Sequence, residues 1–154
     1  MQTNIRIGNL DVEDRRVEDG YGKRELAAIH FLIIHHSATG KDVAPETFTR
    51  YHVETMGWPG IGYNFLIYDD GQIVYVGDLS TIRAHTYSYN QSGVGICLVG
   101  NFDNEWPSPA QLDAAKNLCA NVQFALGWFI PILGHGDMLF NRSTHCPGLT
   151  WNAW

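Results

Sequence analysis

The sequence lacks three features that would each define a class of protein: paired cysteines, an excess of basic residues and a long apolar run. Three cysteines cannot form a paired disulfide framework. The net charge of −6 leaves no basic stripe for phosphates, so we expect no binding of nucleic acid. No apolar run approaches the roughly 20 residues that span a bilayer, and Met1–Gly8 do not resemble a secretion signal. We therefore expect neither membrane insertion nor a signal peptide.

The chain has the size and composition of one globular domain. Its 154 residues, 45% of them hydrophobic, are enough for one core that buries roughly 70% of the surface of the unfolded chain. Charged residues crowd Asp11–Arg24, which is interpreted as an N-terminal arm or a short pair of strands. Residues 1–24 are expected to form an arm packed on the domain. Residues 25–154 contain no linker and are expected to form a single domain.

Short apolar runs predict five strands. Ile29–Ile34 is rich in β-branched residues and too short for a helix alone, so it predicts a strand buried on both faces. Asp69–Gly71 is typical of a hairpin turn between two strands. The expected strands are Ile29–Ile34, Tyr63–Tyr68, Gln72–Val76, Gly93–Val99 and Ile130–Leu133.

Two helices are expected between these strands. The first begins near Pro45 and ends at Gly57. The second is capped by Ser108, and Gln111 is spaced to complete a capping box. Gly127 ends it, and its apolar stripe is Leu112, Ala115, Cys119, Val122 and Leu126. The order of elements predicts an α/β fold: a single domain with a central mixed β-sheet and helices on both faces.

Histidines follow two of the predicted strands. His35 and His36 follow the first, and His135 follows the last. Sites in open α/β sheets gather at the carboxyl ends of strands, and a polar loop can return Cys146 to the same edge. Two imidazoles and a thiolate suit zinc and leave a fourth position open. From spacing alone, three alternatives remain: a catalytic zinc site, a structural one with His36 or His145 as fourth ligand, and histidines hydrogen-bonded at strand ends.

Several short motifs extend this pattern over most of the chain. They are IIHHSAT (Ile33–Thr39), GWPGIGYNF (Gly57–Phe65), His85, Asn90, VGICLVGNF (Val94–Phe102), GHGD (Gly134–Asp137) and THCPG (Thr144–Gly148). In this order they resemble the type 2 N-acetylmuramoyl-L-alanine amidases, a family that includes phage endolysins and peptidoglycan recognition proteins. The resemblance implies that residues 25–154 are a zinc amidase catalytic domain, which hydrolyses the amide between N-acetylmuramic acid and L-alanine in peptidoglycan.

The resemblance also assigns the catalytic centre. It implies a Zn²⁺ ion held by His35, His135 and Cys146. Tyr63 would donate a hydrogen bond to the developing oxyanion. Thr144 would hydrogen-bond the tetrahedral intermediate or the attacking water.

A second set of residues is implied to bind the substrate, peptidoglycan or a muropeptide. These residues are His36, His52, Trp58, His85 and Asn90. The local pattern alone leaves a different interpretation for two of them: His52 as a helix-surface residue and Trp58 as a core aromatic.

Other residues are interpreted as structural. His30, Cys97 and Cys119 lie in apolar or helical patterns and are expected in the core. Relatives that recycle anhydro-muropeptides carry a glutamate at the position of Cys97, so the resemblance is to the phage and recognition branch. The loop Met138–Ser143 is interpreted as an insertion at the edge of the cleft that does not disturb ligation.

The leading hypothesis is therefore a monomeric bacteriolytic enzyme resembling a phage endolysin, made in the host cytoplasm and acting on the cell wall. The alternative is a recognition module that binds peptidoglycan without cleaving it. Non-catalytic members of the family usually lose the ligand cysteine, so the presence of Cys146 favours the enzyme.

Overall fold

A computed structural model describes residues 5–7 and 21–154. Most of the predicted N-terminal arm, residues 1–4 and 8–20, lies outside the described residues. The described residues form one sheet of six strands in the order β1-β4-β3-β5-β2-β6. The strands are β1 (Ile5–Ile7), β2 (Phe31–His36), β3 (Phe65–Ile67), β4 (Ile73–Tyr75), β5 (Gly93–Leu98) and β6 (Ile132–Gly134). Because β3 and β4 pair antiparallel and the other pairs are parallel, the sheet is mixed, as predicted.

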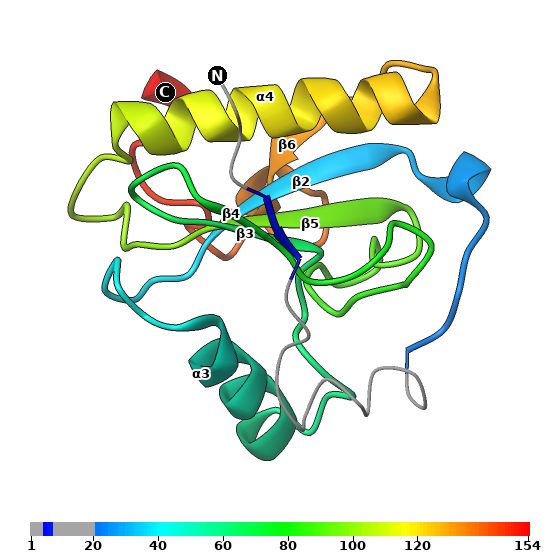
Figure 1. The fold of residues 1–154 in the computed structure, drawn as a ribbon, viewed down its shortest axis with the longest axis horizontal. Coiled ribbons are helices and arrows are strands. Elements are labelled where there is room, and N and C mark those ends of the chain that lie inside the picture. Colours follow the sequence, from blue (N-terminus) through cyan, green and yellow to red (C-terminus); the bar gives the residue numbers. More distant parts are fainter. Residues whose placement is uncertain (1–4, 8–20) are drawn as a thin grey trace.

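Helices cover both faces of this sheet (Figure 1). The long helix α4 (Pro109–Leu126) lies on one face, and α3 (Pro45–Arg50) lies on the other. The π-helical turn η2 (Tyr51–Thr55) continues α3, so the predicted helix ends just before Gly57. Three 3₁₀ turns complete the described helices: η1 (Leu26–Ala28), η3 (His135–Asp137) and η4 (Trp151–Ala153). The predicted fold class is confirmed. Within the described residues, no helix has both the length and the apolar character needed to cross a membrane.

The two faces of the sheet pack into two separate clusters. The larger joins Leu32, Ile34 and Leu98 to the buried side of α4. The smaller, on the α3 side, joins Phe48 to Leu66 and Cys97. Cys97 and Cys119 are both buried, as predicted. Strands β3, β4 and β5 therefore contribute side chains to both clusters, whereas β2 contributes Leu32 and Ile34 to the larger one.

Two strands are displaced from their predicted bounds. The first begins at Phe31 rather than Ile29, because η1 occupies the preceding residues, and its pairing with β5 continues to His36. The last begins at Ile132 rather than Ile130, since Pro131 has no N–H to donate to the ladder. Instead, Pro131 O accepts a hydrogen bond from Leu32 N at 2.9 Å.

Helix α4 begins and ends as predicted, but its capping box is only half formed. Ser108 Oγ accepts a hydrogen bond from Gln111 N at 3.0 Å, and Gly127, at φ 84°, ends the helix. The Gln111 side chain turns into the sheet instead, where Nε2 donates to Ile67 O and Val99 O. The buried side of the helix is therefore rotated from the predicted stripe at its first turns and consists of Gln111, Ala114, Leu118, Cys119, Val122 and Leu126.

Candidate metal centre

The end of β2 places one histidine on each side of the sheet. His35 pairs with Cys97 of the α3-side cluster, so its imidazole lies on that side, where it is 1% exposed. His36 turns the other way, and its Nδ1 accepts a hydrogen bond from Phe102 N at 3.1 Å. Phe102 belongs to the cluster under α4. Of the two histidines, only His35 therefore points its imidazole toward the other candidate ligands.

A turn and a loop bring His135 and Cys146 to His35. His135 begins η3 directly after β6, which pairs with β2. Cys146 Sγ lies 3.6 Å from His35 Nδ1, and the ligand atoms of all three residues lie within 4.8 Å of one another. Nitrogen at about 2.1 Å and sulfur at about 2.3 Å from a tetrahedral zinc ion would lie about 3.6 Å apart. The three side chains therefore fit a zinc ion.

Hydrogen bonds hold the turn after β6 against the cysteine loop. Gly136 N donates to Cys146 O at 2.7 Å. Asp137 Oδ2 accepts from Gly134 N and from Trp151 Nε1, both at 2.8 Å. The positions of His135 and Cys146 thus depend on contacts among loops and the C-terminal turn.

The second ring nitrogen of His35 also has partners. His35 Nε2 lies 3.1 Å from His85 Nδ1 and 3.3 Å from Thr86 Oγ1. His85 Nε2 lies 3.4 Å from Gly93 O, so its hydrogen belongs on Nε2 and its Nδ1 accepts. His35 then donates from Nε2–H, which leaves the lone pair of its Nδ1 facing Cys146.

The approach of His85 to the sheet requires a glycine. A Cβ at position 95 would lie 2.7 Å from the His85 ring, too close for any other residue without a shift. The backbone of the same segment is held by Asn90, whose Oδ1 accepts from His85 N at 2.9 Å and Thr86 N at 2.8 Å. His85 and Asn90, predicted to contact substrate, thus have structural contacts of their own, and their substrate contacts stay predictions.

The loop Met138–Ser143 contributes a contact to His135. Asn141 Oδ1 lies 3.1 Å from His135 Nε2, and Asn141 Nδ2 donates to Tyr87 O at 3.1 Å. The predicted insertion therefore leaves the three ligands together, as expected, and in addition contacts one of them.

Burial controls the charge of the three candidate ligands. Desolvation, followed by the nearby histidines, lowers the pKa of His35 well below its usual value, and burial also lowers the pKa of His135. Both imidazoles are therefore neutral at pH 7, as a metal ligand must be. Burial raises the pKa of the Cys146 thiol to about 12. The thiolate would therefore need an adjacent cation, which a metal ion supplies.

Tyr63 connects this centre to a groove. Its ring centroid lies 5.2 Å from that of His35. Burial raises the pKa of Tyr63 well above 10, so the phenol keeps its proton. The groove has a volume of about 390 Å³ and is lined by Ser37, Thr39, Val43, Thr47, Phe48, Tyr51, His52 and Tyr63. An elongated substrate lying there would reach the ligand cluster past Tyr63.

His52 lines the same groove and packs against Trp58. The ring centroids are 4.8 Å apart, and His52 Nδ1 accepts a hydrogen bond from Gly62 N at 3.1 Å. His52 is 6% exposed, so it is not a helix-surface residue. The predicted role of both residues in substrate binding remains a prediction.

The residues around the cysteine differ in exposure. Thr144 is partly buried, and its Oγ1 accepts a hydrogen bond from Cys146 N at 3.2 Å, which still allows the hydroxyl to donate. His145 is exposed, and neither it nor His36 belongs to the three-residue ligand cluster found among the described residues.

His30, predicted in the core, is exposed because β2 begins one residue later.

Sequence reasoning missed Thr86 and Asn141, which both contact candidate ligands. The only sequence signal for a role of Thr86 was its position directly after His85. Asn141 lies in a segment interpreted as an insertion, where a polar residue is ordinary and indicates no particular contact.

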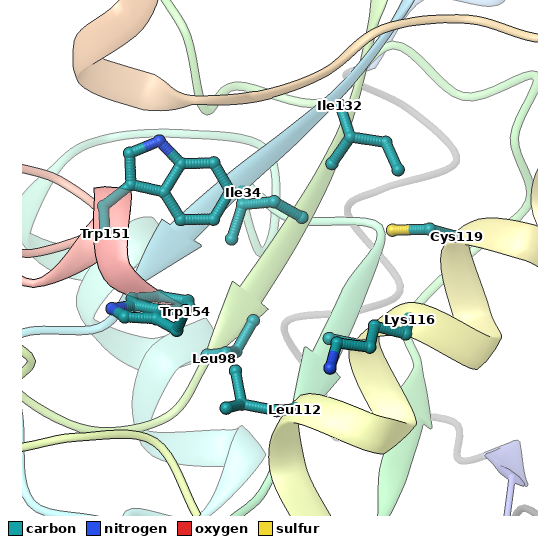
Figure 2. A pocket seen from close by; sticks show the side chains of 9 residues that line it. Ile34, Leu98, Leu112, Lys116, Cys119, Ile132, Trp151 and Trp154 are labelled. Atoms are coloured by element: carbon teal, nitrogen blue, oxygen red, sulfur yellow. The ribbon is translucent and has the colours of Figure 1, made fainter. Parts of the chain in front are cut away.

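A separate apolar cavity lies on the α4 side of the sheet (Figure 2). It has a volume of about 130 Å³ and lies between α4, the strands and the C-terminal turn, where Trp151 and Trp154 pack on Ile34 and Leu98. Since His35 is on the opposite face, this cavity does not belong to the candidate metal centre.

Comparison with known proteins identifies the family of this chain. The N-acetylmuramoyl-L-alanine amidase family matches residues 25–149, so the chain belongs to this family. Among curated relatives, peptidoglycan-recognition protein SA of Drosophila melanogaster is 37% identical over 136 residues. That match covers 82% of this chain and 65% of the relative, so the chain spans about two thirds of that protein.

Solved structures of both recognition proteins and lytic enzymes share the fold. Drosophila peptidoglycan recognition protein SA superposes with a TM-score of 0.79 at 29% identity, covering 97% of this chain and 88% of that one. The Ph2119 endolysin of a Thermus scotoductus bacteriophage gives a TM-score of 0.76 at 28% identity, covering 86% of each chain. A variant of Drosophila recognition protein LB, solved with tracheal cytotoxin, gives a TM-score of 0.75 at 32% identity. The match covers 84% of this chain and 80% of that one.

Proposed function

We propose that this chain is a zinc-dependent amidase that hydrolyses the bond between N-acetylmuramic acid and L-alanine in peptidoglycan. The observation that carries the proposal is the cluster of His35, His135 and Cys146 in a chain of the amidase family. Tyr63 packs near His35 and also lines the groove. Bound zinc would polarise the amide carbonyl and activate water at neutral pH.

We propose that Tyr63 stabilises the negative charge that develops on the substrate carbonyl oxygen. Its phenol is protonated and close to His35, so it can donate to the carbonyl oxygen as that oxygen becomes an oxyanion. The Cys97 thiol is itself buried and neutral, since burial raises its pKa well above the usual range, so we give it no role as a base.

Thr144 has a smaller proposed role. Its hydroxyl is anchored by Cys146 N and can donate to the tetrahedral intermediate or to the attacking water. We assign the stem peptide to the groove beside Tyr63, which is lined by hydroxyl groups and apolar side chains. Likeness to a phage endolysin supports a bacteriolytic role for this activity.

The alternative is a recognition module that binds peptidoglycan without cleaving it. Likeness to recognition protein SA supports this alternative. The proximity of Cys146 Sγ to His35 Nδ1 favours hydrolysis, because three ligands with an open fourth position are typical of catalytic zinc sites.

The test is digestion of purified peptidoglycan with zinc-loaded protein, followed by mass spectrometry of the products. We expect intact stem peptides that begin with L-alanine, and no release after treatment with a chelator. The same preparation is incubated with intact walls and sedimented, to measure binding separately. Protein that binds zinc and sediments with walls but releases no new amino termini would be a recognition module.

A further inference from the structure

The loop Met138–Ser143 extends between two candidate ligands, and one of its residues is unlike its neighbours. Asn141 is 8% exposed, whereas Phe140 and Arg142 on either side are exposed. A buried amide is costly unless its polar atoms are paired. Asn141 meets this requirement with one bond to His135 and one to Tyr87.

These two bonds fix the orientation of the Asn141 amide. Tyr87 O is a carbonyl and can only accept, so the NH₂ group of Asn141 must face it at 3.1 Å. The Oδ1 atom then faces His135 Nε2, also at 3.1 Å. Because Oδ1 only accepts, the hydrogen of the neutral His135 imidazole belongs on Nε2. The lone pair of His135 is left on Nδ1.

The same arrangement occurs at the other imidazole ligand. His35 has its Nε2 against His85 and Thr86, and its Nδ1 faces Cys146. The segment 85–87 therefore supports both imidazole ligands, one directly through side chains and the other through Tyr87 O and Asn141.

We propose that Asn141 is a positioning residue of the metal centre, which holds His135 in the tautomer and ring orientation that present Nδ1 to the metal. The proposal rests on the metal centre of the proposed function. It assigns no contact with substrate to Asn141. Partners of this kind, hydrogen-bonded to a metal-bound imidazole, typically change metal affinity by about 10- to 100-fold when removed.

The test measures zinc affinity by competition with a chelator, in three variants of the full chain. Asn141→Leu keeps the volume but removes the acceptor, and we expect zinc affinity to fall about 10- to 100-fold. Asn141→Asp keeps an acceptor for His135 Nε2–H, and we expect it to restore most of the affinity. Arg142→Ala, an exposed change in the same loop, is the matched control and should bind zinc like the wild type. Wild-type affinity in Asn141→Leu would overturn the proposal.

A second measurement does not depend on the variants folding. Long-range proton–nitrogen NMR of the zinc-free wild type at pH 7.5 should show His135 protonated at Nε2, and zinc should then shift its Nδ1. Protonation at Nδ1 would contradict the proposal. Neither readout uses amidase activity. A protein that passes both tests but cleaves no peptidoglycan would therefore refute the proposed function and leave the role of Asn141 standing.

Discussion

The three candidate ligands come from two different kinds of structure. His35 lies next to the last residue of β2, a strand that pairs on both sides, with β5 and with β6, and its imidazole is almost completely buried. His135 and Cys146 are only partly buried and lie in a turn and a loop joined by the bond between Gly136 N and Cys146 O. One half of the centre is therefore part of the core of the fold, and the other half packs against it.

This difference separates the effects of mutations on folding from their effects on metal binding. A change at His35 should affect both stability and metal binding, because His35 is paired with Cys97 in the sheet and hydrogen-bonds His85. A change in the loop half should reduce metal binding with less effect on stability. Placing one ligand on a rigid strand gives a fixed reference to which the loop ligands are brought.

The largest expected effect comes from removing one ligand in each half. Both His35→Ala and Cys146→Ala should abolish zinc binding and turnover, because two ligands remain. In chelator, His35→Ala should also lower the free energy of unfolding by about 2–3 kcal/mol, through a cavity and unpaired neighbours. Cys146→Ala should lower it by less than about 1 kcal/mol, since only a sulfur atom is lost. Metal analysis and urea unfolding measure both quantities. Equal destabilisation by the two variants would remove the distinction between the halves.

The next largest effect is a loss of catalysis without a loss of metal binding, at Tyr63 beside His35. Tyr63→Phe should lower kcat by about 100- to 1,000-fold, or about 3 kcal/mol, because an oxyanion donor is lost. Zinc content and KM should stay close to those of the wild type, since the ring and its packing on His35 are retained. Steady-state release of amino termini measures this. Full turnover by Tyr63→Phe would exclude the role that we assign to its hydroxyl.

The smallest effect is a pH dependence of the free energy of unfolding that comes from His52, which lines the groove. Burial lowers the pKa of His52 to about 4, whereas it is about 6.5 in the unfolded chain. Between these values the unfolded chain binds more protons, so the free energy of unfolding falls as the pH falls from 6.5 toward 4. At pH 5 the loss from this residue is about 2 kcal/mol.

The variant His52→Asn isolates this contribution. Asparagine cannot titrate, and its Oδ1 can replace Nδ1 as acceptor for Gly62 N. Urea unfolding of the metal-free protein at pH 7 and pH 5 should therefore show a smaller decrease in the variant than in the wild type. The same decrease in both proteins would mean that His52 is not held neutral by burial.

Local signals were enough to predict the elements of the fold. The hairpin at Asp69–Gly71 and the helix that begins after Ser108 were both predicted correctly, because turn and cap chemistry acts within a few residues. The strand boundaries were not, since the extension of β2 to His36 depends on β5 as its partner. Gln111 was also misassigned. In a capping box its side-chain oxygen would accept from Ser108 N–H, but its NH₂ group instead donates to Ile67 O and Val99 O.

The sequence by itself determined which residue types follow which strands, and through the family motifs it identified His35, His135 and Cys146 as one cluster. Ligand identity is a matter of residue type and order along the chain, so it can be read without coordinates. Only the tertiary structure decided which nitrogen of each imidazole is left free to bind a metal. That choice depends on His85 and Asn141, partners that approach from distant segments and whose hydrogen bonds leave no local pattern in the sequence.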